Sequence, residues 1–349
     1  MRVVVVGASG NVGTSLLQSL SADERVTSVL GLARRRPDWR VGKTEWAEVD
    51  ITIDDLAPHF RGADAVVHLA WIFQPTHDPV RTWETNVLGT VRILESVAAV
   101  DVPALVYSSS VGAYSPGPKD RRVDESWPTH GWPAAAYCRE KAYVERLLDT
   151  FELRHPERRV VRLRPGFIFK REAASEQRRL FAGPLLPNSL VRPEALQVLP
   201  DIPGMRFQAL HSADAAEAFH LAITKPVHGA FNVAADPVLD MPTLAEALGA
   251  RTVRMPRWPA RGLLSAAWHL RLLPAAPDLF DAVVRLPIMD TSRAHRELGW
   301  SPRRSSLDAV CEFLEGLQAG AGMDTPPLSR DTGGRLRLRE FMSGVGQRP

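Results

Sequence analysis

The chain has 349 residues, which is long enough to bury a large core and to form two lobes. Its 45% hydrophobic content indicates a globular protein, and a net charge of only +3 gives no reason to expect a nucleic-acid partner. The two cysteines, Cys138 and Cys311, show neither disulfide nor metal-ligand spacing, so we expect a cytoplasmic protein without a metal site.

No stretch of the sequence suggests a membrane partner. A strand is predicted from residue 2, which leaves no room for a signal peptide. The apolar stretch from Gly262 to Leu273 contains His269 and Arg271 and is too short to span a bilayer. We therefore expect a soluble protein.

The first element is a buried strand that runs into a glycine-rich turn, VVVVGASGNVG at residues 3–13, followed by a helical run at 14–20. This arrangement directs backbone N–H groups and the positive end of a helix dipole at one spot, which suits a pyrophosphate. Glycines at three-residue spacing permit a tight turn, approach of the ligand, and close packing of the helix on the strand. The predicted binding residues are Gly7, Ser9, Gly10, Asn11, Val12 and Gly13.

Short apolar strands then alternate with amphipathic helices through the first half of the chain. We predict strands at 26–32, 45–49, 65–69, 104–108 and 160–163, and helices at 54–60, 85–100 and from about 135. This alternation requires crossover connections and predicts an α/β protein with a doubly wound parallel sheet, the Rossmann fold. The ligand should lie at the carboxyl ends of the strands.

The pattern changes after Pro165. Residues 170–208 are rich in Pro, Arg and Leu and predict irregular segments that cover a site. A helix at 212–224 and a strand at 229–234 are expected to rejoin the sheet, and helices at 244–248 and 306–317 belong to the remainder. We predict a dinucleotide-binding domain (1–169 plus about 209–235), a smaller mixed substrate-binding lobe (about 170–208 plus 236–317) and a mobile tail (318–349).

The end of the second strand bears on the choice of dinucleotide. Arg34, Arg35 and Arg36 follow it, and no Asp or Glu occurs between Arg25 and Pro37. In this type of fold an acidic residue there binds the ribose 2′-hydroxyl, whereas arginine suits a 2′-phosphate. The sequence therefore favours NADP, bound through Arg34 and Arg35, with NAD and a merely solvated basic turn as alternatives.

Tyr137 and Lys141 lie four residues apart in a helical stretch, which places them on one face. A nearby ammonium and a cationic nicotinamide lower the pKa of a phenol from near 10, so that it can exchange a proton with a substrate oxygen while hydride moves. Such pairs are also common on helix surfaces. Here, however, the predicted strand at 104–108 leads into three serines, Ser108 to Ser110, at the edge where the ligand should lie.

Together these residues resemble the extended short-chain dehydrogenases/reductases, also called the NAD-dependent epimerase/dehydratase family. The resemblance extends to about residue 317. It rests on GASGNVG at 7–13, VDI at 49–51, DAVVHLAW at 64–71, NVLGTVRILE at 86–95, YSSSVGAY at 107–114, YCREK at 137–141, RLRPGFIF at 162–169, HSADAAEAF at 211–219, FNVA at 231–234 and DTSRAHRELGWSPR at 290–303.

The resemblance implies roles for individual residues. Tyr137 would be the catalytic acid/base, Lys141 would lower its pKa and hold the nicotinamide ribose, and Ser110 would bind the substrate oxygen. Asn86 would steady the site, unless it caps a helix. The implied cofactor contacts are Asp50, Ile51, Leu69, Ala70, Trp71, Ser108, Tyr137, Lys141, Pro165 and Phe167. His68 is expected to be a packed strand residue, His211 and Asp214 to cap a later helix, and helices 85–100 and 135–153 to form a homodimer.

We therefore predict an enzyme, an NADP(H)-dependent oxidoreductase acting on a substrate carbinol or carbonyl carbon. The alternatives are a nucleotide-sugar epimerase or dehydratase with bound NAD, and a non-catalytic dinucleotide-sensing protein. Two groups of candidate pocket residues favour different classes of substrate. Met205, Phe207, Leu210, Trp258 and Trp268 would suit an apolar carbonyl compound, whereas Arg171, Arg178, Arg179 and Arg206 could meet a diphosphate.

Overall fold

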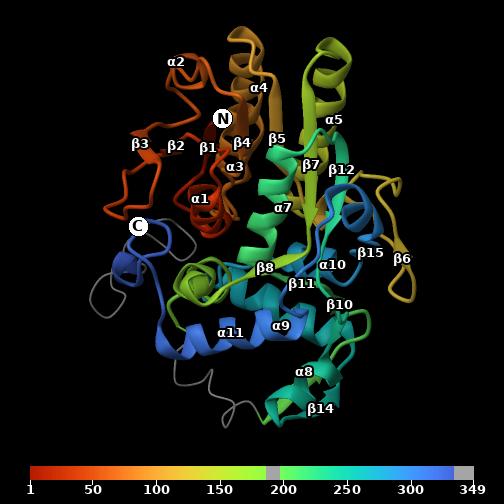
Figure 1. Ribbon diagram of the computed structural model, residues 1–349. Helices are drawn as coiled ribbons and strands as arrows, with labels where there is room; N and C mark the ends of the chain where they lie inside the picture. The colour runs from red at the N-terminus through yellow and green to blue at the C-terminus, as the bar shows by residue number, and fades with distance from the viewer. Residues whose placement is uncertain (186–196, 334–349) are drawn as a thin grey trace.

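The computed structural model describes residues 1–185 and 197–333, and a seven-stranded parallel sheet forms its centre (Figure 1). The strand order is β12-β7-β5-β4-β1-β2-β3. The strands are β1 (Arg2–Val6), β2 (Ser28–Ala33), β3 (Thr44–Glu48), β4 (Ala65–His68), β5 (Ala104–Ser108), β7 (Arg159–Pro165) and β12 (Gly229–Val233). The predicted α/β class and doubly wound parallel sheet are confirmed.

Helices cover both faces of this sheet (Figure 1). One face carries α1 (Asn11–Ala22) and α7 (Ser212–Thr224), and the other carries α2 (Ala57–Phe60), α4 (Gly89–Ala99) and α5 (Ala136–Arg154). Because successive strand residues point to opposite faces, a strand covered on both sides must be apolar throughout, which explains the four valines of β1.

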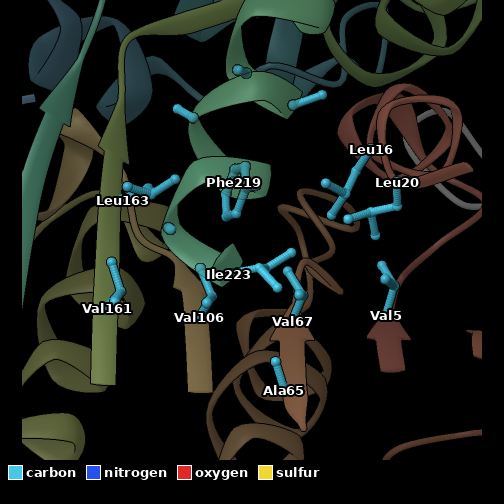
Figure 2. Packing of buried hydrophobic residues seen from close by; sticks show 14 of the residues in the cluster. Val5, Leu16, Leu20, Ala65, Val67, Val106, Val161, Leu163, Phe219 and Ile223 are labelled. Atoms are coloured by element: carbon cyan, nitrogen blue, oxygen red, sulfur yellow. The ribbon is translucent and has the colours of Figure 1, made fainter. Parts of the chain in front are cut away.

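The face beneath α1 and α7 shows how tightly the sheet is covered. Figure 2 shows Phe219 and Ile223 of α7 lying over the strands, beside Leu16 and Leu20 of α1. All four side chains are essentially inaccessible to solvent. Burying a side chain of this size stabilises the fold by about 1.5–3 kcal/mol, so this packing fixes α1 and the turn that precedes it.

The strand order changes direction between β1 and β4, and this places the expected binding crevice. From β1 the chain adds β2 and β3 on one side, then crosses back to β4, β5 and β7 on the other. Ligands of open parallel sheets bind at such a switch point, outside the carboxyl ends of the strands. The loops after β1 and β4 therefore flank the expected site.

The predicted long helix at 85–100 differs from the structure in two respects. The helical run begins earlier, with α3 (Pro79–Trp83), and contains a π-helical turn at Glu84–Leu88 before α4. A π turn carries one extra residue per turn, so it changes the direction in which the following side chains point. Asn86 lies in this turn.

The remaining described elements lie mostly below the sheet in Figure 1. Short elements interrupt the segment 170–208, which was expected to be irregular, and its residues 186–196 lie outside the described residues. The other helices are α6 (Ala174–Gln177), α8 (Met241–Leu248), α9 (Arg257–His269), α10 (Pro277–Val283) and α11 (Ser306–Ala319). The other strands are β6 (Arg122–Val123), β8 (Phe167–Phe169), β9 (Val198–Asp201), β10 (Arg206–Phe207), β11 (Ala209–His211), β13 (Leu239–Asp240), β14 (Arg251–Arg254) and β15 (Ile288–Met289).

The segment after α11 was expected to be a mobile tail, but its described part packs against the body of the protein. Leu328 is fully buried, and the Thr325 hydroxyl donates a hydrogen bond to the carbonyl oxygen of Ser9 at 2.9 Å. Arg179 donates hydrogen bonds to the carbonyl oxygens of Pro327 and Ser329. Residues up to 333 are thus held beside the glycine turn, and 334–349 lie outside the described residues.

Within the described ranges, no helix combines the length and the apolar character needed to cross a bilayer.

Candidate active site

The glycine turn after β1 is closed by two glycines that accept no side chain. Gly7 has a φ of +84°, and a Cβ there would lie 2.6 Å from the backbone nitrogen of Ala70. A Cβ at Gly13 would lie 2.5 Å from the carbonyl oxygen of Gly7. At Gly10 the nearest atom would be 3.5 Å away, so the protein itself leaves room there. Gly10 is therefore the point where a ligand can approach the backbone.

The N-terminus of α1 is suited to an anion. Gly10 is its N-cap, no side chain in the described part of the chain caps it, and its first turn contains no acidic residue. Lys170, which the sequence reasoning missed, donates hydrogen bonds to the Asn11 carbonyl oxygen at 2.9 Å and the Thr14 hydroxyl at 2.6 Å. Burial lowers the pKa of Lys170 to about 8, so its ammonium is still mostly charged at neutral pH. The helix dipole and this ammonium together favour a negatively charged ligand.

A continuous cavity of about 670 Å³ connects this turn with Tyr137. Its lining contains almost all residues predicted for the site. These are Gly7, Ser9, Gly10, Asn11, Val12, Gly13, Arg34, Arg35, Ile51, Leu69, Ala70, Trp71, Ser108, Ser110, Tyr137, Lys141, Pro165 and Phe167. Asp50 and Asn86 are outside the lining. Pro326 and Pro327, from the segment after α11, contribute to it as well.

At the end of β2, Arg34 and Arg35 line the cavity and are exposed. Within residues 1–185 and 197–333 neither guanidinium has a hydrogen-bond partner, so both can meet a ligand. Ile51 lines the same cavity. Asp50 instead accepts hydrogen bonds from the backbone and hydroxyl of Thr52, at 2.9 and 2.6 Å. Its side chain stabilises the turn after β3, and Asp50 itself does not line the cavity, whereas Val49 and Ile51 do.

Tyr137 lies in the first turn of α5, and its phenol is near the hydroxyl of Ser110. Ser110 Oγ accepts a hydrogen bond from the backbone of Gly112 at 2.9 Å, which fixes the serine. Burial raises the pKa of Tyr137 above its ordinary value, and the hydrogen bond from Ser110 offsets part of that rise. Without a bound dinucleotide, the phenol of Tyr137 is therefore protonated and neutral at pH 7.

Lys141 lies beneath an aromatic ring. Its Nζ donates a hydrogen bond to the Ser108 carbonyl oxygen at 2.7 Å and lies 3.4 Å from the ring centroid of Trp71. Burial lowers the pKa of Lys141 well below its usual value, while a cation–π contact of this kind favours the charged form. Nζ is 6.0 Å from the ring centroid of Tyr137. The lowering of the Tyr137 pKa by Lys141 thus stays a prediction for the protein with a bound dinucleotide.

Aromatic rings hold the phenol in place. The ring of Phe73 stacks on Tyr137, with centroids 4.3 Å apart and planes 11° apart, and Trp71 meets it edge-on at 6.0 Å. Gly112 leaves the necessary space, because a Cβ there would lie 2.7 Å from Cε1 of Tyr137. Sequence reasoning missed the roles of Phe73 and Gly112. For Gly112 the signal is its place in YSSSVGAY, whereas nothing in the local sequence points to Phe73.

Asn86 contacts the backbone beside the cavity lining. Its side-chain amide accepts a hydrogen bond from the Ile72 nitrogen and donates one to the Ile72 oxygen, both at 2.8 Å, and donates another to Glu140 at 2.7 Å. Ile72 lies between the two rings that contact Tyr137, and Glu140 precedes Lys141. Asn86 is buried within the π-helical turn and is not a helix cap. These contacts agree with the expectation that Asn86 steadies the site, which stays a prediction.

We expect Asn86→Ala to lower kcat by about 10- to 100-fold with little change in dinucleotide affinity, because a small misplacement of reacting groups is costly. Steady-state kinetics and fluorescence titration with the dinucleotide measure the two quantities. The matched control is Thr82→Val, which removes a 2.6 Å hydrogen bond to Glu140 but leaves the contacts with Ile72. An equal loss of kcat in both variants would show that the Ile72 contacts are not the cause.

The histidines considered from the sequence do not reach the cavity. His68 is buried in β4 next to the Thr90 hydroxyl, and burial lowers its pKa to about 3. His211 caps α7, and Asp214 accepts hydrogen bonds from the backbone of Arg303 and Arg304. No group of His, Cys, Asp and Glu that could hold a metal ion occurs among the residues that the structure describes.

The candidate pocket residues of the second half mostly lie elsewhere. Met205, Phe207, Leu210, Trp258 and Trp268 are outside the cavity lining, and Trp258 is 78% exposed. Different apolar side chains line it, from the turn before Gly183 and from α10: Leu180, Phe181, Leu279, Ala282, Val283 and, just beyond α10, Leu286. Of the four arginines considered for a diphosphate, Arg178 lines the cavity.

The fold and the cavity define a dinucleotide-binding α/β enzyme. The NAD dependent epimerase/dehydratase family matches residues 3–234, and the chain belongs to this family. The predicted family and the prediction that the protein is an enzyme are thereby confirmed.

Three relatives illustrate the range of similarity. An uncharacterized protein of Mycobacterium tuberculosis is 24% identical over 326 residues, which cover 90% of this chain and 83% of that protein. A UDP-glucose 4-epimerase of Yersinia pestis is 31% identical over 184 residues, covering 47% and 52%. The crystal structure of the Thermus thermophilus UDP-glucose 4-epimerase in complex with NAD has a TM-score of 0.66 at 22% identity, covering 92% of this chain and all of that chain.

Proposed function

We propose that this protein is an NADP(H)-dependent oxidoreductase in which Tyr137 exchanges the proton with the substrate. The observation that carries the proposal is that Tyr137, Ser110 and Lys141 line the same cavity as the glycine turn. A dinucleotide with its pyrophosphate at the N-terminus of α1 and its ribose at Lys141 fits the distribution of these groups along the cavity.

A nicotinamide held in this cavity would supply hydride to a substrate carbonyl carbon, or accept it from a carbinol carbon. In the reducing direction the neutral phenol of Tyr137 donates its proton to the carbonyl oxygen, and in the oxidising direction it takes the proton back. Ser110 orients that oxygen with its hydroxyl. The rings of Phe73 and Trp71 shield the phenol from water, which supports proton exchange with the substrate in preference to solvent.

Arg34 and Arg35 support the choice of NADP. Both line the cavity directly after β2, where the adenosine ribose is expected, and Asp50 is outside the lining. A 2′-phosphate would form charge-assisted hydrogen bonds with one or both guanidinium groups. Such hydrogen bonds contribute about 1.5–3 kcal/mol, which corresponds to about a 10- to 100-fold preference over NAD.

Arg34→Ala tests this assignment. We expect wild-type protein to bind NADPH more tightly than NADH, and the substitution to reduce that preference by about tenfold or more, because the 2′-phosphate loses a charged donor. Fluorescence titration with NADPH and NADH provides the two dissociation constants. Arg36→Ala is the matched control, since Arg36 is exposed but outside the cavity lining. Tighter binding of NADH to wild type, with no effect of Arg34→Ala, would rule out the NADP assignment.

A nucleotide-sugar epimerase or dehydratase with bound NAD is the second candidate. The similarity to the Yersinia pestis UDP-glucose 4-epimerase favours it. Such an enzyme would keep NAD through gel filtration and would act on UDP- or dTDP-sugars without net consumption of a coenzyme. The first proposal instead requires stoichiometric oxidation of NADPH with a carbonyl substrate.

We further infer a homodimer and a cytoplasmic location. The expected dimer helices lie side by side as α4 and α5, and Leu88, Tyr143 and Leu153 in this part of the chain are exposed apolar side chains. Cys138 and Cys311 are free thiols, as suits a reducing compartment. A non-catalytic sensor would have no need of the half-buried Tyr137 and the buried Lys141, so we favour the enzyme.

A further inference from the structure

We propose that the substrate is a ketone or secondary alcohol with an apolar, ring-bearing carbon skeleton and no diphosphate. This inference rests on the proposed function, because it names the compound whose oxygen Tyr137 would protonate. Three features of the described cavity carry it: a continuous aromatic wall beside Tyr137, an apolar face of α10, and the arrangement of the charged side chains.

The aromatic wall begins at the reacting phenol. Phe73 stacks on Tyr137 at 4.3 Å, and Phe181 meets Phe73 edge-on with ring centroids 5.4 Å apart. All three rings line the cavity. Gln74 holds this wall together, because its side chain donates hydrogen bonds to the carbonyl oxygens of Leu180 at 2.6 Å and Pro274 at 3.1 Å. A flat apolar group next to the reacting carbon would therefore contact aromatic rings whose neighbouring residues, Gln74 and Leu180, are joined by a hydrogen bond.

Helix α10 contributes only apolar side chains to the described lining. Leu279 and Val283 lie one turn apart on α10, with Ala282 beside them, and Leu286 follows the helix. None of these side chains can donate or accept a hydrogen bond. The hydroxyl groups and diphosphate of a nucleotide sugar would lose their hydrogen bonds to water against this surface without replacement, which is costly.

Most of the positively charged side chains of the cavity lie where the dinucleotide is expected to bind. Within the described residues the charged side chains of the lining are Arg34, Arg35, Lys141, Glu176 and Arg178. Arg34 and Arg35 follow β2, and Lys141 lies at the expected nicotinamide ribose. Glu176 and Arg178 have opposite signs, so together they add no net charge. The described lining thus offers no surplus positive charge for a second diphosphate.

The four arginines that could have met a diphosphate already have partners within the protein. Arg178 donates a hydrogen bond to the carbonyl oxygen of Gly183 at 2.7 Å. Arg206 donates to the carbonyl oxygen of Lys119 at 2.6 Å, and Arg171 pairs with Glu315 at the surface. Arg179 binds the segment after α11 through the carbonyl oxygens of Pro327 and Ser329.

The reaction balances with the coenzyme as the reductant. The carbonyl carbon of the ketone gains hydride from NADPH, and its oxygen gains the proton of the Tyr137 phenol. The products are the secondary alcohol and NADP⁺, and the phenolate regains a proton from water. The reverse direction oxidises the alcohol. No other co-reactant is needed.

Binding to the NADP⁺-loaded protein tests the inference separately from turnover. Isothermal titration calorimetry with 2-acetylnaphthalene and with UDP-glucose measures both affinities. We expect the naphthyl ketone to bind at least about tenfold more tightly. Val283→Lys and, independently, Leu279→Lys should weaken ketone binding by about tenfold or more, because each places an ammonium against the apolar group. The control is Leu263→Lys on α9, where Leu263 is 70% exposed and outside the lining.

Different outcomes would overturn the substrate class and the oxidoreductase function. Tighter binding of UDP-glucose, no saturable binding of the ketone, or ketone affinity that neither α10 variant changes would overturn the substrate class. Retained NADP⁺ binding by the variants shows that they are folded. If the ketone binds as expected but NADPH is never oxidised, the proposed oxidoreductase function fails while the substrate pocket stands.

Discussion

Replacing Tyr137 with phenylalanine is expected to lower kcat by about 10²- to 10⁴-fold, the usual contribution of a positioned acid/base. The substitution removes only the phenolic oxygen. The ring can still stack on Phe73 at the same place, and Gly112 still leaves room for it. Dinucleotide affinity should change little, because the glycine turn, Arg34 and Lys141 stay in place. The loss would thus report the missing proton donor.

Single-turnover oxidation of NADPH at saturating ketone measures this effect, with fluorescence titration for dinucleotide affinity. Tyr143→Phe is the matched control: Tyr143 lies on the same helix, is 45% exposed and is outside the cavity lining. The control should have wild-type kcat. If Tyr137→Phe retained the wild-type rate, another group would have to carry the proton.

The pH dependence of the two directions should differ in sign. Because burial raises the pKa of Tyr137, its phenol is protonated across the neutral range and can serve as an acid in reduction. Oxidation needs the phenolate, whose population increases with pH. We therefore expect the rate of alcohol oxidation to rise through the alkaline range, while the rate of ketone reduction stays flat until the phenol ionises.

The sequence predicts those parts of the site whose chemistry is local. A run of valines followed by glycines at three-residue spacing favours a strand, a tight turn and a closely packed helix, and Gly7 and Gly13 are indeed positions where a Cβ would clash. The spacing of Tyr137 and Lys141 is likewise a property of one helix. The structure brings both to the cavity that the turn opens into.

Features that depend on tertiary packing could not be predicted in this way. The π-helical turn that directs Asn86 toward Ile72 depends on tertiary packing, because the local sequence predicts an ordinary α-helix. Trp258 and Val283 are both apolar residues of helices in the second half. Only the packing of α9 and α10 decides that Trp258 is exposed while Val283 lines the cavity.

Replacing Glu145 with alanine is expected to lower the free energy of unfolding by about 3–5 kcal/mol, because it leaves buried charges without their partner. The Glu145 side chain is fully buried on α5. Arg164 donates to both of its carboxylate oxygens, at 2.9 and 3.0 Å, and Arg162 donates to one at 3.0 Å. Arg162 keeps Asp149 and Glu152 in the variant, so Arg164 loses more.

The destabilisation should depend on pH. Burial alone would raise the pKa of Glu145, but the hydrogen bonds and charges of Arg164 and Arg162 outweigh burial and lower this pKa to about 2. A carboxylate with a lowered folded-state pKa contributes its full stability above its unfolded pKa, near 4.3, and loses it as the pH falls toward 2. The difference in stability between wild type and Glu145→Ala should therefore shrink in acid.

Urea unfolding at neutral pH and at about pH 3 measures both effects. Glu157→Ala is the control, because Glu157 is a 61% exposed partner of Arg158 at 3.2 Å, and such surface ion pairs contribute about 0–1 kcal/mol. A Glu145→Ala variant no less stable than this control at neutral pH would contradict the buried network.

The same carboxylate connects stability with the site. The Ser109 hydroxyl donates to Glu145 at 2.5 Å, so one side chain joins α5, which carries Tyr137 and Lys141, to the loop that carries Ser110. In Glu145→Ala protein that remains folded, the phenol and the Ser110 hydroxyl would lose this common anchor. We expect kcat to fall together with stability in this variant, whereas the surface control changes neither, because Glu145, unlike the exposed Glu157, connects α5 to the serine loop and to β7.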